Sequence, residues 1–134
     1  MSLKTTTDEV EGRIPITVVA LDGELDASNF EALIDTVRQL YDGGTRRLLI
    51  DLTDLRFMAS SGLVALHSIV RIMHGEAPPD PEAGWSALHA DIAPGQTEVQ
   101  LCAPQAAVAR VLSRTGLDRL FMVHPDRDTA IAAV

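Results

Sequence analysis

Apolar and polar residues along the chain follow two periods, one typical of strands and the other typical of helices. Runs rich in β-branched residues predict strands, the clearest of which covers 14–21. Apolar residues that recur every three or four positions predict helices, as they do from Phe30 to Tyr41. The predicted strands are 3–10, 14–21, 47–52, 98–103 and 120–123, and the predicted helices are 26–41 or 28–41, 61–73, 106–114 and 126–134.

This order of elements predicts an α/β fold, with a mixed central sheet of about five strands packed against about four helices. A length of 134 residues and a hydrophobic content of 46% suit one domain over 1–134 with a single core. Residues 74–96 interrupt the pattern, because they contain four prolines and three glycines and therefore predict a long inserted loop. Within it, Trp85, Leu88 and Ile92 are spaced like one face of a short helix, which we expect to pack on the domain; an exposed partner surface is the alternative.

Composition then narrows the classes of function. The net charge of −8 argues against nucleic acid and anionic membranes as partners. No apolar run approaches the roughly 20 residues that span a bilayer, and the first residues carry no secretory segment. The lone Cys102 lies in a strand-like run, so it is predicted to be a buried core residue in a reducing compartment. We therefore expect a cytoplasmic protein without membrane insertion.

Motifs for enzymatic chemistry are missing from the sequence. It contains no G-x-S-x-G elbow, no Walker A loop and no G-x-G-x-x-G. The four histidines lack metal-ligand spacing, so we expect no metal and no cofactor, and we place them on the surface or in loops: His67, His74, His89 and His124. Asp51 and Asp54 flank a predicted strand end and are interpreted as residues that orient the following loop. A hydrolase that uses Ser60 is the remaining enzymatic alternative.

The turn Ser60-Ser61-Gly62 is the strongest candidate for function, since it lies where a strand passes into a helix. The free amides and positive dipole end of a helix accommodate a phosphate at such a position. The alternative interpretation is that Ser60 or Ser61 only caps the helix, with Gly62 allowing the backbone to turn. Residues 25–28 should lie at the same end of the sheet. There Asp26 or Ser28 caps the helix that follows it, or contacts a partner, or does both.

Three segments together resemble the STAS domain family, which includes bacterial anti-sigma-factor antagonists and the cytoplasmic tails of sulfate transporters. They are L-D-G-E-L-D at 21–26, the run from Leu49 to Leu63 around A-S-S-G-L, and the late helix and turn at 111–121. The resemblance covers the chain apart from 74–96, and it implies a regulatory protein-binding module without enzymatic activity. It also implies a partner that is both an anti-sigma factor and a serine kinase, and a phosphatase that resets the cycle.

Carried over by position, the resemblance makes Ser60 the phosphorylation site. It also implies a partner-binding surface composed of Glu24, Asp26, Ser28, Ala59, Ser60, Ser61 and Gly62. Ala59 stands where the family has an acidic residue. The alternative function within the same fold is a STAS subunit of a lipid or anion transport complex.

Overall fold

The computed structural model describes residues 3–11, 15–74 and 98–133. Its five strands form one sheet in the order β1-β2-β3-β4-β5, in which β1 and β2 are antiparallel and all other neighbours are parallel. The strands are β1 (Leu3–Glu11), β2 (Pro15–Leu25), β3 (Leu48–Met58), β4 (Val99–Cys102) and β5 (Met122–His124). The predicted α/β fold with a mixed five-stranded sheet is confirmed.

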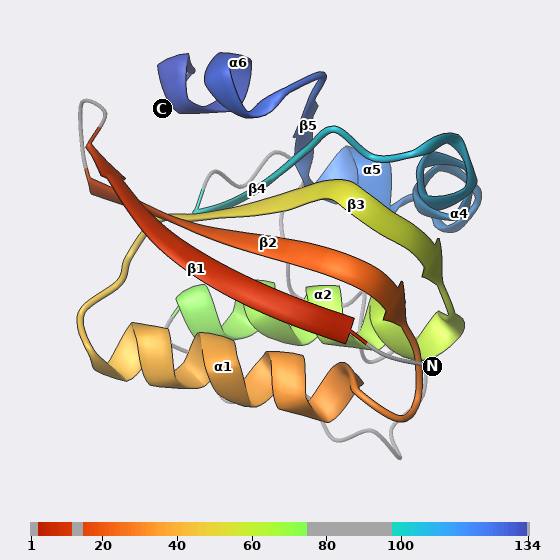
Figure 1. The fold of residues 1–134 in the computed structure, drawn as a ribbon, viewed down its shortest axis with the longest axis horizontal. Coiled ribbons are helices and arrows are strands. Elements are labelled where there is room, and N and C mark those ends of the chain that lie inside the picture. The colour runs from red at the N-terminus through yellow and green to blue at the C-terminus, as the bar shows by residue number, and fades with distance from the viewer. Residues whose placement is uncertain (1–2, 12–14, 75–97, 134) are drawn as a thin grey trace.

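Helices cover the sheet on both faces. Two long helices, α1 (Phe30–Asp42) and α2 (Ser60–Met73), lie side by side under one face, and α6 (Arg127–Ala132) lies over the other (Figure 1). Between them in sequence come α4 (Ala106–Thr115) and the short α5 (Leu117–Leu120). The described part of the chain thus has five helices, one more than predicted, because α5 occupies residues between the predicted helix and the last strand.

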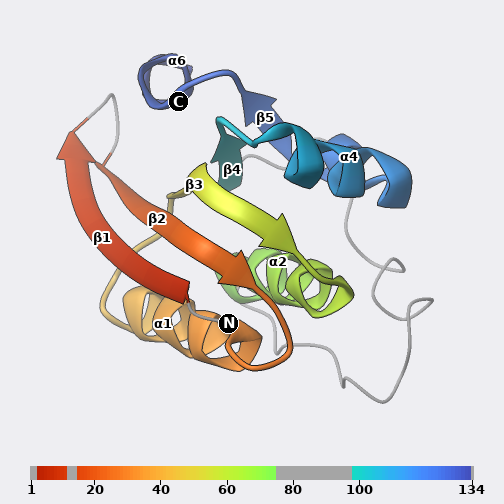
Figure 2. The same cartoon turned by 45° about the vertical axis from the view of Figure 1, so that its right-hand side comes forward.

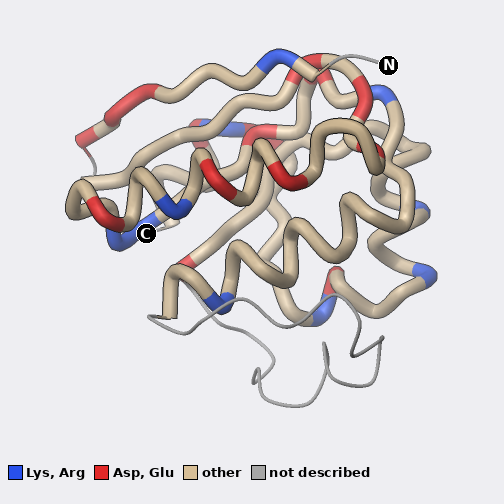
Figure 3. The backbone as a smooth tube through the Cα atoms, turned by 90° about the horizontal axis from the view of Figure 1, so that it is seen from below, with Lys and Arg blue, Asp and Glu red and all other residues tan. Residues whose placement is uncertain are grey.

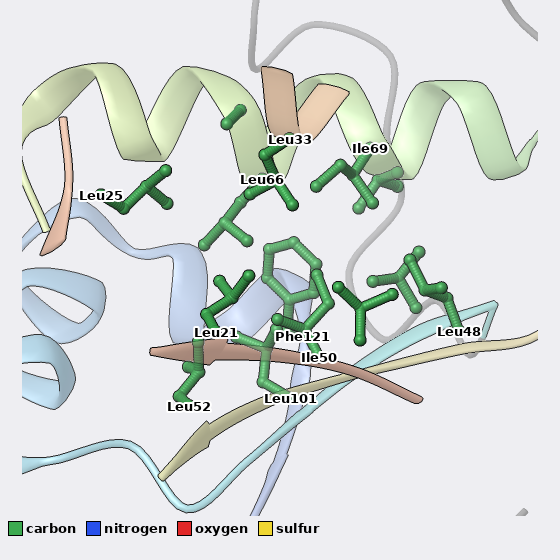
Figure 4. Packing of buried hydrophobic residues seen from close by; sticks show 14 of the residues in the cluster. Leu21, Leu25, Leu33, Leu48, Ile50, Leu52, Leu66, Ile69, Leu101 and Phe121 are labelled. Atoms are coloured by element: carbon green, nitrogen blue, oxygen red, sulfur yellow. The ribbon is translucent and has the colours of Figure 1, made fainter. Parts of the chain in front are cut away.

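The main core lies between the sheet and the pair α1 and α2 (Figure 4). Alternate residues of the strands point into it, including Leu21 of β2 and Ile50 of β3, and they meet Leu33 of α1 and Leu66 of α2. A smaller cluster on the opposite face packs under α6 and includes Leu49 and Cys102. The start of β3 is therefore buried on both faces, which explains its continuous apolar run, and the predicted burial of Cys102 is confirmed.

Strands β2 and β3 are both longer than predicted. β2 continues through Asp22-Gly23 to Leu25, and β3 continues to Met58. Their pairing shifts register between Ala20 and Asp22 and again between Gly23 and Glu24. The extra residues lie in β3, where the alternation of buried and exposed positions is broken, whereas β2 alternates regularly from Leu21 to Leu25. These extensions carry both strands to the serine turn, and their ends lie side by side above the start of α2 (Figure 2).

The prediction that the histidines lie at the surface or in loops is wrong for two of them. His67 is only 1% exposed, because α2 is buried over most of its circumference. His124 is also buried and its Nε2 is 2.6 Å from Oε1 of Gln100 on the neighbouring strand. The inserted loop with Trp85 and His89 lies outside the described residues, apart from His74. No helix in the described ranges is long and apolar enough to cross a membrane.

Candidate functional site

Ser60 lies at the junction of β3 and α2, as the first residue of the helix. The residue before it, Ala59, has extended backbone angles and occupies the cap position without a side-chain hydrogen bond. The interpretation of Ser60 or Ser61 as the helix cap is therefore wrong. The side chain of Ser60 is exposed, and its hydroxyl forms no hydrogen bond with any described residue. It is consequently free to react with or bind an external group.

Backbone hydrogen bonds hold the turn against the end of β2. The amide of Ala59 donates to the carbonyl of Leu25 at 2.9 Å, and the amide of Gly62 donates to the carbonyl of Ala59 at 2.9 Å. Leu25 and Met58 are paired residues at the ends of the two strands. The position of Ser60 is therefore set by main-chain contacts rather than by side chains of the turn.

Gly62 is required by close packing. A Cβ atom at this position would lie 2.6 Å from Cγ of Met58 and 3.1 Å from the side chain of Leu25. The backbone of Gly62 has no positive φ, so the expectation that the glycine serves a backbone turn is wrong. Its missing side chain lets α2 begin directly against the two strand ends.

Ser61 differs from Ser60 in accessibility. Its Oγ is buried and has no hydrogen-bond partner among the described residues. Of these two adjacent serine hydroxyls, that of Ser60 is therefore the accessible one.

The loop after β2 is internally ordered and lies next to the serine turn. Asp26 accepts hydrogen bonds from the hydroxyl of Ser28 at 2.6 Å and from its amide at 2.9 Å. These bonds, the hydroxyl first, hold the pKa of Asp26 below its ordinary value. Asn29 donates to the carbonyl of Glu24 at 2.8 Å and directly precedes α1. Asp26 and Ser28 thus shape the loop rather than cap α1, and the carboxylate of Asp26 stays ionised.

The structure also exposes a residue at this corner that the sequence analysis did not select. Phe57 is 43% exposed and pairs in register with Glu24. A regular alternation in β3 would not make both Arg56 and Phe57 exposed before the buried Met58, so the exposure of Phe57 does not follow from the sequence pattern. Two adjacent exposed positions at a register shift indicate a bulge, which a sequence pattern with period two does not predict.

Carboxylates surround this corner. Glu24, Asp26 and Asp54 form no ion pair within the described residues. Asp22 lies 3.9 Å from the guanidinium of Arg56. Asp and Glu are gathered on the side of the molecule formed by β1, β2 and α1 (Figure 3). The corner therefore carries net negative charge.

Asp51 does not belong to this corner, and its interpretation as a loop-orienting residue is wrong. It lies inside β3, where Oδ2 accepts hydrogen bonds from Nη2 and Nε of Arg127 at 2.8 and 3.1 Å. Its Oδ1 accepts from the amide of Thr53 at 3.0 Å. Burial raises the pKa of Asp51, but the bonds from Thr53 and Arg127 outweigh this and leave that pKa below its ordinary value. This carboxylate binds α6 to the sheet.

A pocket opens at the opposite end of β2 and β3. Its lining includes Thr17, Arg47, Met73 and Glu98. Arg47 lies 3.8 Å from Glu98, which also contacts His74 at 2.9 Å, so these charges compensate one another. Among the described residues, no group of three or more His, Cys, Asp or Glu is placed to hold a metal ion. The serine corner, formed by the Ser60-Ser61-Gly62 turn, the loop 24–28 and Phe57, remains the stronger candidate for the functional site.

Comparison with known proteins agrees with the fold and the motifs. Residues 15–77 match the family model described as "Mlab, STAS domain". An anti-sigma factor antagonist from Mycobacterium paratuberculosis is 26% identical, with a TM-score of 0.71 over 99% of this chain and 94% of that one. The family match and the structural matches support a STAS domain of the anti-sigma-factor antagonist type, and the chain has the STAS fold.

Two further structures share the fold at lower identity. SpoIIAA, a Bacillus anti-sigma factor antagonist known in unphosphorylated and phosphorylated forms, is 19% identical in its unphosphorylated form, with a TM-score of 0.70 over 97% of this chain and 95% of that one. The STAS domain of a SulP transporter from Vibrio cholerae is 18% identical, with a TM-score of 0.58 over 88% of this chain and 77% of that one. A search of curated proteins finds no match to the sequence.

Proposed function

We propose that the chain is an anti-sigma-factor antagonist, which binds an anti-sigma factor with serine kinase activity and is switched by phosphorylation of Ser60. The observation that carries this proposal is the exposed hydroxyl of Ser60 at the β3–α2 junction, which forms no hydrogen bond with the described residues. The chain also shares its fold and 26% of its sequence with an anti-sigma factor antagonist over nearly its whole length. The unphosphorylated form binds the anti-sigma factor and thereby releases a sigma factor. A phosphatase restores it.

A phosphate on Ser60 is compatible with the fold. The first residue of α2 lies beside free helix amides, which favour negative charge. Modification adds a charge of about −1.5 to −2, and a charge of this size disrupts an interface wherever the facing surface of the partner is apolar or acidic. Micromolar to nanomolar complexes have binding free energies of about 8 to 12 kcal/mol, so a loss of a few kcal/mol at this contact would release the partner.

The remaining residues of the surface have distinct roles in this proposal. Glu24, Asp26 and Ser28 form the neighbouring loop that contacts the partner. Gly62 lets α2 begin directly against the strand ends, with Ser61 beside it in the first turn. Ala59 contributes its main chain through the bond to Leu25. Recognition at this position therefore proceeds without the carboxylate that the family usually has.

The proposed role is that of a binding module rather than an enzyme. It requires no cofactor and no nucleic acid, and it is exerted in the cytoplasm, where sigma factors act. The exposed Ser60 hydroxyl forms no hydrogen bond to a base within the described residues, which gives no support to the hydrolase alternative.

Phosphorylation by the purified anti-sigma factor kinase of the same organism tests the proposal. Mass spectrometry after incubation with ATP should locate one phosphate on Ser60, and Ser60→Ala should abolish it. Ser113→Ala is the matched control, because Ser113 is also an exposed serine but lies on α4, outside the proposed surface, and it should leave modification unchanged. Ser60→Asp should weaken binding at least about a hundredfold, which corresponds to roughly 2.7 kcal/mol. Unmodified Ser60 together with unchanged affinity of Ser60→Asp would exclude the switch.

A second candidate is a STAS subunit of a transport complex. The description of the matched family model and the shared fold of the SulP transporter domain favour it. Co-purification with a membrane permease, in place of an anti-sigma factor kinase, would support this function. The two candidates differ at Ser60, because a constitutive subunit would keep its partner when Ser60 carries a negative charge.

A further inference from the structure

Phe57 is an exposed aromatic residue at the end of a central strand. The described residues contain three large hydrophobic side chains that are exposed, namely Phe57 at 43%, Met122 at 42% and Val123 at 39%. Met122 and Val123 lie together on the edge strand β5, whereas Phe57 belongs to the serine corner. A phenylalanine side chain contributes most free energy to folding or binding when it is fully removed from water. In this fold the Phe57 side chain stays partly in water.

The position of Phe57 makes it continuous with the proposed partner surface. It precedes Ser60 by three residues, so the two Cα atoms lie within about 11 Å of each other. Glu24 is its paired neighbour on β2, at the usual separation of about 4.8 Å between strands. The acceptor hydroxyl, the ring and the loop with Asp26 therefore lie at the same corner of the molecule.

Charge around the ring is unbalanced. Glu24, Asp26 and Asp54 have no ion pair within the described part of the chain. The nearby cationic residues are Arg56 and Lys4, and both are next to Asp22. Arg56 contacts the Asp22 carboxylate, and Lys4 of β1 pairs in register with Asp22. An apolar centre inside a charged rim is the usual anatomy of a protein-binding surface.

We infer that Phe57 is the apolar anchor of the interface with the anti-sigma factor kinase. The partner inserts the ring into an apolar pocket whose rim is basic and faces Glu24, Asp26 and Asp54. This inference rests on the proposed function and adds to it the chemistry of the partner's surface. The anchor supplies affinity through burial, while the carboxylates accelerate association and make it sensitive to salt.

Binding to the purified anti-sigma factor kinase, measured by surface plasmon resonance, tests this assignment. Phe57→Ser should raise Kd at least about tenfold, mainly through faster dissociation, whereas Phe57→Leu should retain most of the affinity. Met122→Ser is the matched control, since that side chain is equally exposed but lies on β5, and its Kd should stay within about twofold of wild type. Glu24→Lys should slow association, and the difference should shrink as salt rises.

The possible results separate the two proposals. Wild-type affinity in Phe57→Ser, with wild-type protein bound normally, would refute the anchor and leave the proposed function standing. Equal losses in Phe57→Ser and Met122→Ser would also refute it, because the contact would then not be specific to the corner. No binding of the wild-type protein to the kinase would overturn the proposed function and this inference together. Circular dichroism of each variant shows that a loss of affinity is not a loss of fold.

Discussion

Asp51 of β3 and Arg127 of α6, 76 residues apart in sequence, are joined by two hydrogen bonds to one carboxylate oxygen, at 2.8 and 3.1 Å. The same guanidinium lies 3.9 Å from Asp8 of β1. One arginine thus connects the last helix to a central strand and to an edge strand. The pair is largely shielded on the carboxylate side, where the Asp51 side chain is 10% exposed.

Arg127→Ala should therefore destabilise the fold by about 1.5 to 3 kcal/mol, the usual value of hydrogen bonds to a charged group. Urea denaturation at pH 7 measures the effect. Arg38→Ala is the control, because the Arg38–Asp35 pair is exposed on α1 and should contribute less than about 0.5 kcal/mol. Equal effects of the two substitutions would contradict the assignment of Arg127.

The pH dependence of this contact follows from the lowered pKa of Asp51. A carboxylate with a lowered pKa in the folded state stabilises the fold above its unfolded pKa of about 3.9, and the contribution is lost as the pH falls through the folded value. The free energy of unfolding of wild type should therefore approach that of Arg127→Ala as the pH falls below the unfolded pKa of about 3.9. A difference that stays constant from pH 7 to pH 2.5 would contradict this.

Gly62→Ala should destabilise the corner, although alanine favours helices. The new Cβ would meet Cγ of Met58 at 2.6 Å, and overpacking of this kind costs about 1 to 3 kcal/mol, more than the roughly 1 kcal/mol gained in helix propensity. Gly43→Ala is the control, since its Cβ would make only ordinary contacts, 3.4 Å from the carbonyl oxygen of Gln39. Thermal denaturation should lower Tm for the first variant and leave it unchanged for the second.

Ala59→Asp should stabilise the fold. Ala59 holds the cap position of α2 in extended geometry without a capping side chain, and an aspartate there can accept hydrogen bonds from free helix amides for about 1 kcal/mol. Chemical denaturation of Ala59→Asp, Ala59→Ser and Ala59→Val should place the first two above wild type. Equal stability of the Val and Asp variants would show that capping is not the cause.

Cys102 should react slowly with thiol reagents in the folded protein. Burial, the charge of Asp51 and a hydrogen bond to it raise the pKa of this thiol to about 12, so little thiolate forms at pH 8. Ellman's reagent should modify it only after unfolding in urea. A Ser28→Cys variant provides an exposed thiol for comparison and should react at once. Rapid modification of native wild type would show that the sheet opens under α6.

The hydrophobic pattern predicted the fold class because each strand and helix buries one continuous face. The pattern failed to predict two features, namely the ends of the long strands and the burial of α2. The pairing of the extended strands is irregular. Asp22-Gly23, which pairs in the sheet, and Arg56-Phe57, of which only Phe57 pairs, therefore both resemble loop residues. The burial of His67 was missed because a nearly all-buried helix removes the polar face that the pattern assumes.

The candidate site was located from its motifs, while its geometry came only from the structure. The Ser60 turn and the Asp26 loop were expected at one end of the sheet, and Leu25 and Ala59 do join them there. Motif spacing did not reveal that the hydroxyl of Ser61 is buried, that Gly62 is needed for space or that Phe57 is exposed. Each of these depends on contacts between residues of different elements, which a single sequence does not specify.

The main-chain bond from Ala59 to Leu25 has an evolutionary consequence. Since the amide and carbonyl groups of the corner are common to nearly all amino acids, the side chains at 59 and 60 can be exchanged without rebuilding the junction. Duplicated copies of such a gene could acquire different partners through a few substitutions at these positions. The scaffold would thus allow parallel signalling pathways to become insulated from one another while every copy keeps the same architecture.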